Sequence, residues 1–205
     1  MATPSSGAIS LNDMHVEAGG SSGTTCSIND ADIRLIANKS SGATASWNDY
    51  YNRAADFTTV VTVGGTSTTF TDGYVSIITR YRGYLNSSPS GASNIGSLSV
   101  SNDADYFSNN GFTDLAVNGQ QAQTSSSIRV RVSVEGIANN DTAFKSVVIG
   151  SSTYNRTDAT YVSSNGKTQW YWSSSSTTVP ADDTSAFAPF AASGSTTTVV
   201  FRRSR

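Results

Sequence analysis

The chain of 205 residues has little of the side-chain chemistry on which most enzymes depend. It contains one histidine, His15, and one cysteine, Cys26. A single cysteine excludes an intrachain disulfide framework, and a single histidine leaves one place at which a Ser–His–Asp triad could form. Charged residues make up only 14% of the chain and the formal net charge is −2. This composition favours neither a nucleic-acid-binding surface nor a polybasic membrane patch.

Long hydrophobic runs are absent as well. No stretch approaches the roughly 18 apolar residues of a membrane-spanning helix, and residues 1–7 lack the basic start and apolar core of a signal peptide. The sequence therefore predicts a protein that is made in a cytoplasm and does not insert into a membrane. Its solubility is expected to come mainly from Ser, Thr, Asn and Gly.

What the chain does contain is one pattern, Ser-x-Asn-Asp, three times: Ser10–Asp13, Ser27–Asp30 and Ser46–Asp49. In a capping box, the Ser side chain accepts from the third backbone N–H of a helix while an acidic side chain reaches back to the Ser N–H. We therefore expect each copy to begin a short helix, over residues 12–17, 29–38 and 48–55. Apolar residues should pack as staples across each box: Ile9 with Met14, Cys26 with Ala31, and Ala45 with Tyr50.

From Phe57 onward the pattern changes from helical to extended. In the clearest strand, residues 127–135, Ile128 and Val130 lie on the core face and Arg129 lies on the other. Gly64 and Gly65 are typical of a hairpin turn between strands at residues 58–63 and 66–70. Further strands are expected at residues 74–81, 97–100, 144–149, 152–154, 159–162, 168–172 and 196–203.

These patterns predict a mainly β protein, an antiparallel β-sandwich preceded by an N-terminal segment of short capped helices. We expect residues 1–55 to form a docking segment and residues 56–205 to form a sandwich-like domain, with a subdivision near residue 125 as an open alternative. Helices this short are marginal in water unless tertiary contacts hold them. Residues 1–55 should therefore bury little by themselves and gain order from a neighbouring domain or another subunit.

Three N-terminal blocks, Gly7–Gly20, Ser27–Arg34 and Ser46–Tyr51, resemble the opening of structural proteins from tailed bacteriophages, notably those of cyanobacterial and other marine hosts. The C-terminal part is similar to the β-rich module that often follows this opening, through residues 144–150, 153–161 and 170–172. The resemblance implies a component of the virus particle, such as a tail or fibre protein. It assigns no catalytic residue to this chain.

Carboxylate pairs are candidates for catalysis, because a phage glycosidase that degrades surface polysaccharide would use two of them. The candidates are Asp103, Asp105, Asp114, Glu135, Asp182 and Asp183. None stands beside an aromatic cluster that the sequence can identify, and the chain is short for such an enzyme. We interpret His15 as a residue near a helix end and Cys26 as a small packed side chain. A polysaccharide-degrading enzyme is therefore the least favoured function, and we expect no enzyme.

A metal site is the second chemical alternative, because Asn-Asp-Ala-Asp occurs at residues 29–32 and again at residues 102–105. Oxygen-rich clusters can bind Ca²⁺, but neither copy has the glycine and distal glutamate of a calcium loop. Helix capping explains the first copy and can explain the second. We therefore expect no metal and no cofactor.

Aromatic side chains are the best candidates for recognition. Trp170 and Trp172 alternate on one face of an expected strand, with Tyr171 on the other. Exposed rings can stack on sugars or anchor a protein interface. Two tryptophans on one face of a sandwich strand are more often core, so Tyr171 is the better candidate for an exposed contact.

The leading hypothesis is a non-enzymatic virion structural protein that assembles as a symmetric oligomer in the tail, baseplate, neck or fibre attachment region. Its expected partners are other virion proteins and copies of itself, without nucleic acid. The alternatives are a host-receptor or glycan-binding adhesin, with a host cell-surface glycan as partner, and a capsid decoration protein. The residues expected to shape the docking segment are Ser10, Asp13, Ser27, Asp30, Ser46 and Asp49.

Overall fold

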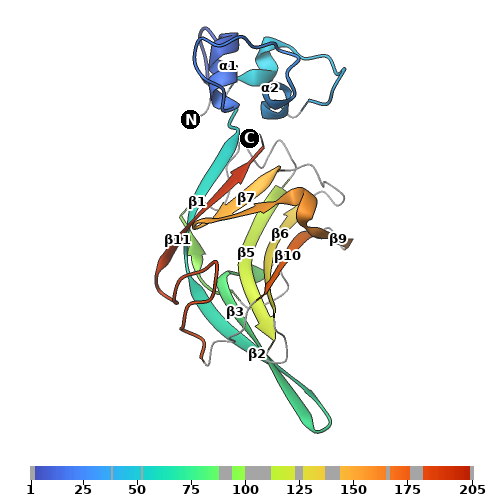
Figure 1. The fold of residues 1–205 in the computed structure, drawn as a ribbon, viewed down its shortest axis with the longest axis vertical. Coiled ribbons are helices and arrows are strands. Elements are labelled where there is room, and N and C mark those ends of the chain that lie inside the picture. The colour runs from blue at the N-terminus through green and yellow to red at the C-terminus, as the bar shows by residue number, and fades with distance from the viewer. Residues whose placement is uncertain are drawn as a thin grey trace.

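The computed structural model of the chain describes residues 3–37, 39–51, 53–87, 94–99, 112–122, 127–136, 144–164, 167–175 and 182–203. The protein is elongated, with a helical module at one end of its long axis, two β-sheets in the middle and a two-stranded arm at the other end (Figure 1). The expected fold class is confirmed, because strands predominate, both sheets are antiparallel, and the α-helices precede the strands.

Residues 3–55 form the N-terminal module, whose short helices pack around a core of their own. The helices are α1 (Leu11–Glu17), α2 (Ala31–Ile36) and the 3-10 helix η1 (Trp47–Tyr50). The core includes four side chains with no exposed surface: Met14, Ile33, Ile36 and Tyr50. The expectation that this segment buries little by itself is wrong, because helices too short to be stable alone cover one another's apolar faces.

The described strands form one sheet of five and one of six. The five-stranded sheet has the order β4-β1-β11-β7-β8, with β1 (Asp56–Thr62), β4 (Ser97–Leu98), β7 (Ser146–Ile149), β8 (Ser152–Asn155) and β11 (Thr196–Arg202). The six-stranded sheet has the order β2-β3-β5-β6-β10-β9, with β2 (Gly64–Asp72), β3 (Val75–Tyr84), β5 (Phe112–Ala122), β6 (Ser127–Gly136), β9 (Thr160–Ser164) and β10 (Lys167–Ser175). A short 3-10 helix, η3 (Arg156–Asp158), lies between β8 and β9. Strands β5 and β6 lie on either side of residue 125 and pair with each other.

The main core lies between the two sheets. Trp170 of β10 packs edge-on against Phe144, with ring centroids 4.8 Å apart, and Phe144 packs edge-on against Phe201 of β11 at 5.5 Å. Aromatic pairs in this geometry add to the stabilisation from burial alone, so the stack joins the two sheets. Strand β6 contributes the buried side chains that its alternation predicts: Ile128, Val130 and Val132.

The chain passes from one sheet to the other at Val63, which corrects the expected Gly64-Gly65 hairpin. Strand β1 pairs with β11 and β4, whereas β2 pairs with β3 in the other sheet. A Cβ on Gly64 would lie 2.2 Å from the backbone nitrogen of Gly96, and one on Gly65 would lie 1.8 Å from the carbonyl oxygen of Asp183. The two glycines therefore permit a close approach of backbones and do not form a turn.

Strand β5 is the longest of the described strands. No strand was predicted at residues 112–122 from the sequence. The Asn118-Gly119 step of β5 has the composition of a hairpin turn. In the structure Gly119 admits the ring of Phe187, because a Cβ on Gly119 would lie 2.7 Å from that ring. The glycine is thus explained by a contact with a residue far away in the sequence.

The β arm, defined as residues 69–78, projects from the six-stranded sheet (Figure 1). Strand β2 pairs with β3, but β3 pairs with β5 only from Thr79 to Tyr84. Among the described strands, the arm is therefore a two-stranded ribbon without a third neighbour. It ends in a turn at Gly73, whose φ is +57°. The arm exposes three large apolar side chains: Phe70, Tyr74 and Val75.

The N-terminal module meets the sandwich where β1 begins and β11 ends. Arg203 is 4% exposed, and its Nη1 donates to the Ile36 carbonyl at 2.8 Å. The backbone N–H of Arg203 donates to the carbonyl of Ala55 at 2.8 Å. The N–H of Ala55 in turn donates to Glu17 Oε1 at 3.0 Å. These hydrogen bonds attach α1 and α2 to the end of the sandwich.

Candidate functional site

All three Ser-x-Asn-Asp motifs bring the aspartate back to the serine N–H. The N–H to carboxylate distance is 2.7 Å in Ser10–Asp13, 2.8 Å in Ser27–Asp30 and 2.7 Å in Ser46–Asp49. Ser10 Oγ also accepts from the Asp13 N–H at 3.1 Å, which completes the capping box of α1. A complete box also precedes η1. Helix capping is therefore confirmed at the first and third motifs, although η1 ends five residues before the expected position 55 (55 − 50 = 5).

The second motif differs from the expectation. Ser27 and Asp30 close a turn in which the Asp30 N–H donates to the Ser27 carbonyl at 2.9 Å, and α2 begins only at Ala31. Asp30 is the N-cap residue, but its side chain makes no capping hydrogen bond. Ala31 is exposed, so Cys26 packs against the core of the module without the expected partner. One sequence pattern thus has two local structures.

We expect acid to destabilise the N-terminal module. The Ser10 N–H holds the pKa of Asp13 below its ordinary value, and the Ser46 N–H does the same for Asp49. A carboxylate whose pKa is lower in the folded protein stabilises it fully above the ordinary pKa, and this contribution is lost as the pH falls through the folded-state value. Helical circular dichroism and the thermal midpoint should therefore decrease below about pH 4.

The matched control for this acid effect is the double variant Asp13→Asn and Asp49→Asn. It should have a lower midpoint at neutral pH and a smaller further decrease in acid. An equally steep decrease in the variant would assign the acid sensitivity to other carboxylates.

A surface pocket of about 410 Å³ opens on the N-terminal module beside the first capping box. Val16, which is 44% exposed, supplies apolar surface to it, and Asp13 and Glu17 supply carboxylates. The other lining residues are Thr3, Pro4, Asn12 and Ser22. Apolar surface next to carboxylates could receive a long side chain with a cationic end from a partner protein.

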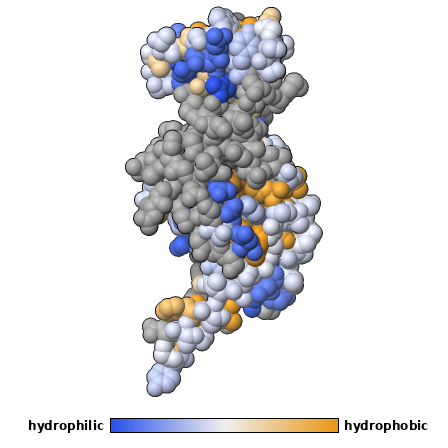
Figure 2. Space-filling model, turned by 180° about the vertical axis from the view of Figure 1, so that it is seen from behind, coloured by the Kyte–Doolittle hydropathy of each residue, from blue (hydrophilic) through white to orange (hydrophobic). Residues whose placement is uncertain are grey.

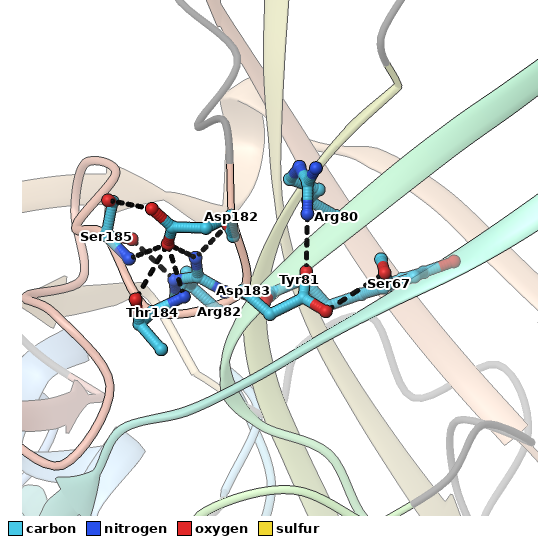
Figure 3. Close-up of polar contacts among 8 residues, drawn as sticks. All are labelled: Ser67, Arg80, Tyr81, Arg82, Asp182, Asp183, Thr184 and Ser185. Carbon is cyan, nitrogen blue, oxygen red and sulfur yellow. Dashed lines mark hydrogen bonds and ion pairs between the residues drawn. The ribbon is translucent and has the colours of Figure 1, made fainter.

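On the inner face of the six-stranded sheet, buried Arg82 of β3 holds the loop of residues 182–195 (Figure 3). Its side chain has no exposed surface, and its Nε donates to the Ser185 carbonyl at 2.6 Å. Nη2 donates to the Asp182 carbonyl at 2.7 Å, and Nη1 donates to the Tyr81 carbonyl at 2.9 Å. The guanidinium carbon also lies 5.5 Å from the ring centroid of Phe187. Arg82 is therefore an anchor of this loop.

The carboxylates of Asp182 and Asp183 belong to the same anchor. Asp182 accepts from the backbone N–H groups of Thr184 at 2.7 Å and Ser185 at 2.6 Å, and these bonds hold the pKa of Asp182 well below its ordinary value (Figure 3). Asp183 accepts from Arg80 Nη1 at 2.7 Å and from the Ser67 hydroxyl at 3.0 Å. Asp182 and Asp183 were candidate catalytic carboxylates from the sequence. In the structure their role is to shape and hold the loop.

The sandwich separates the aromatic residues that were candidates for recognition. Trp170 is 1% exposed and Trp172 is 6% exposed, so both belong to the core and neither can stack on a ligand. Tyr171 lies on the opposite face, partly exposed, with the Arg129 guanidinium carbon 5.2 Å from its ring centroid. Its hydroxyl donates to Gln169 Oε1. The burial of the two tryptophans agrees with the core position that their shared strand face favours, and recognition through Tyr171 stays a prediction.

The candidate base and nucleophile, His15 and Cys26, both lie in the N-terminal module. His15 Nε2 is 2.7 Å from Thr24 Oγ1, and the His15 ring covers Gly20 so closely that a Cβ there would lie 2.2 Å from it. Cys26 is partly buried against the core of the N-terminal module. Both residues are thus explained by packing within the module.

The remaining carboxylate candidates do not gather. Asp114 accepts from Asn86 Nδ2 at 3.1 Å. Within the described ranges, no three His, Cys, Asp or Glu side chains are grouped as a metal site. Asp103 and Asp105, and with them the repeated motif at residues 102–105, lie outside the described residues, as does the side chain of Glu135.

The β arm was not predicted from the sequence. Residues 66–81 were expected to form ordinary strands of the sandwich. A signal for the arm was present in the composition of β2, whose residues are Gly-Gly-Thr-Ser-Thr-Thr-Phe-Thr-Asp. A strand with one large apolar side chain in nine residues cannot fill a sandwich core. Such a strand is expected to leave the sheet body or to lie at its edge.

None of the family models, curated proteins or solved structures compared with the chain matches it. None of the described helices is both long and apolar enough to cross a membrane.

Proposed function

We propose that the chain is a non-enzymatic structural protein of a tailed-phage virion that assembles as a symmetric oligomer. In this proposal the N-terminal module docks on the particle, and the sandwich and its β arm contact neighbouring subunits. The position in the particle is the tail, baseplate, neck or fibre attachment region.

The observation that carries the proposal is the distribution of exposed apolar side chains along the molecule. Val16 and Trp47, at 44% and 48% exposure, lie in the N-terminal module. Phe70, Tyr74 and Val75 lie on the β arm, at the other end of the long axis (Figure 1), and apolar surface is visible along the arm in Figure 2. The remaining large apolar side chain that is exposed among the described residues, Val162, lies on the sandwich in β9. Exposed apolar side chains concentrated at the two ends of an elongated chain are typical of a protein that is held between partners.

The resemblance of residues 7–20, 27–34 and 46–51 to the opening of phage structural proteins supports the same proposal. These blocks coincide with the N-terminal module, in which two of the three Ser-x-Asn-Asp motifs cap helices. The motifs would give the module a fixed surface for docking. Its pocket beside Val16 would be part of that surface.

The proposal is tested by changing the exposed side chains of the module in the complete chain. The double variant Val16→Asp and Trp47→Asp should fold, because both side chains are exposed, and should enter particles at least about tenfold less than the unchanged chain, a difference of about 1.4 kcal/mol. The measurement is the amount of tagged chain in purified particles of the host phage. The matched control is Thr25→Asp, at an exposed position of the same module outside the pocket. Normal incorporation of the folded double variant would contradict docking through this surface.

A further inference from the structure

The six-stranded sheet ends in two strands, β2 and β9, that have only one neighbour each among the described strands. Every pairing in this sheet is antiparallel: β2 with β3, β3 with β5, β5 with β6, β6 with β10, and β10 with β9. In a sheet with an even number of alternating strands, the two edge strands run in opposite directions. Another copy of the same sheet can therefore be added edge to edge, without being turned over, and the new pair is again antiparallel.

We propose that β2 of one copy pairs with β9 of the next copy, so that the six-stranded sheet continues across the subunit boundary. This inference rests on the proposed function, because it names the contact that builds the symmetric oligomer. The contact is heterologous, meaning that two different edges meet. Repeated contacts of this kind close into a ring when the rotation between copies permits it.

The exposed apolar side chains of the two edges lie on the same face of the sheet. Residues directly opposite one another in paired strands share a face, and so do residues two or four positions apart in one strand. Thr66 is opposite Tyr81, Tyr81 is opposite Gln120, Gln120 is opposite Arg129, and Arg129 is opposite Ser173. This series follows one face of the sheet from β2 to β10.

Phe70 and Val162 can both be placed on this face. Phe70 lies four residues after Thr66 in β2 and is 63% exposed. Val162 of β9 is opposite Gln169, which lies four residues before Ser173 in β10, and Val162 is 44% exposed. Through Gln169, Ser133 and Ala116, Val162 lies level with the start of β2, and Phe70 lies farther along that strand. If β2 of one copy joins β9 of the next with the two sheets displaced along their strands, these two apolar side chains come to the same side of the new strand pair and can cover each other.

Apart from Asp72 at the end of β2, neither edge carries the charged residues or prolines that normally prevent such pairing. Natural edge strands are protected by lysine, proline, bulges or short length. Strand β9 contains no charged residue and no proline, and the only charged residue of β2 is Asp72 at its end. The edges of the five-stranded sheet are shorter, with two residues in β4 and four in β8, against nine in β2 and five in β9.

The β arm also requires a neighbour. A two-stranded ribbon is only marginally stable in water, and residues 69–78 have no third strand among the described strands. A strand from the next copy along β2 would convert the base of the ribbon into part of a three-stranded sheet. Pairing with β9 would thus stabilise the arm and bury part of its apolar surface.

Disulfide cross-linking between copies tests the contact. In the complete chain with Cys26→Ser, we would make three double variants, combining Val162→Cys with Thr66→Cys, Thr68→Cys or Phe70→Cys. These three β2 positions share the face of Val162, and directly opposite residues in an antiparallel pair are within disulfide range. Mild oxidation should convert at least one double variant into a ladder of covalent multimers on non-reducing gels. The matched control, Thr68→Cys with Thr153→Cys on the edge strand β8, should give no ladder.

Placing a charge on the β9 edge tests the same contact without cross-linking. Val162→Lys should weaken self-association by about tenfold or more in sedimentation or light-scattering measurements, because an edge lysine opposes strand pairing. Thr153→Lys on β8 should leave self-association unchanged. If Val162→Lys changes the circular dichroism of the fold, Thr160→Lys on the same strand and face replaces it.

The inference is overturned if the protein forms an oligomer, none of the three double variants gives a ladder, and Val162→Lys does not weaken self-association. In that case the proposed function still stands. A chain that remains monomeric at about 1 mM, where even a contact of about 4 kcal/mol would be populated, also overturns the inference. Incorporation into particles, measured as above, decides separately whether the proposed function fails.

Discussion

Arg82→Ala is expected to loosen the loop of residues 182–195 and to lower the stability of the whole sandwich. The guanidinium, which has no exposed surface itself, donates part-buried hydrogen bonds to the carbonyls of Tyr81, Asp182 and Ser185. Hydrogen bonds from a charged group contribute about 1.5–3 kcal/mol each, and water can reach part of these three, so we expect the free energy of unfolding to decrease by about 3 kcal/mol. For a chain of this size, that corresponds to a decrease in the thermal midpoint of about 6–12 °C.

The neighbouring arginine provides the control for this prediction. Arg80 is partly exposed and pairs with Asp183, whose side chain is 41% exposed. An ion pair of this kind contributes about 1 kcal/mol or less, so Arg80→Ala should have a much smaller effect. Hydrogen exchange of residues 182–195 should increase in Arg82→Ala well before global unfolding. Equal midpoints for the two variants would show that Arg82 does not anchor the loop.

Trp170→Ala is expected to have an effect of similar or larger size, through the core. Its ring is 1% exposed and packs between Phe144 and Tyr161, with centroids 4.8 Å and 6.0 Å away. Replacing a buried tryptophan with alanine removes buried apolar surface and leaves a cavity. Together these lower the free energy of unfolding by about 3–5 kcal/mol. Chemical denaturation should show this as a lower midpoint with little change in the slope of the transition.

Tyr171→Ala is the matched variant on the other face of the same strand. Its side chain is partly exposed, so we expect the free energy of unfolding to change by less than about 1 kcal/mol. The variant also tests the alternative of an adhesin. Loss of glycan-array binding in Tyr171→Ala, with the fold intact, would favour that alternative, whereas unchanged binding or no binding by either protein would count against it.

Local patterns were sufficient to locate most of the regular elements. The alternation in residues 127–135 predicted β6 and the face that enters the core, since a strand with one apolar face has only one stable orientation in a sandwich. The first and third Ser-x-Asn-Asp motifs predicted capping boxes, because the bonds of a box join residues three positions apart. Both features depend on near neighbours in the sequence.

The local pattern at Gly64-Gly65 predicted a hairpin turn that the structure does not have. Gly64 and Gly65 have the composition of a hairpin turn, and so does Gly119 after Asn118. In the structure Gly64 makes room for Gly96, Gly65 for Asp183 and Gly119 for Phe187, which lie 32, 118 and 68 residues away in the sequence (96 − 64 = 32, 183 − 65 = 118, 187 − 119 = 68). A glycine that permits a distant close contact cannot be distinguished from a turn glycine by its immediate neighbours.

The candidate sites were predicted less completely than the fold. The sequence identified Trp170 and Trp172 as aromatic and on one face, but only packing against Phe144 and the other sheet decided that this face is buried. The β arm was missed because a projecting hairpin and a sandwich strand have the same alternation. What differs is the number of strands beside them, and that number is a property of the sheet.

By itself, the sequence determined that the protein has short capped helices followed by antiparallel strands, because both signals arise from contacts within a few residues. Only the tertiary structure decided that the N-terminal helices share a core, that the chain changes sheet at Val63, that Arg82 fastens a distant loop, and that an apolar arm leaves the sheet. Each of these depends on which distant segments meet. Distant segments meet where burial and hydrogen bonding are satisfied for the whole chain at once, and no short stretch of sequence specifies that condition.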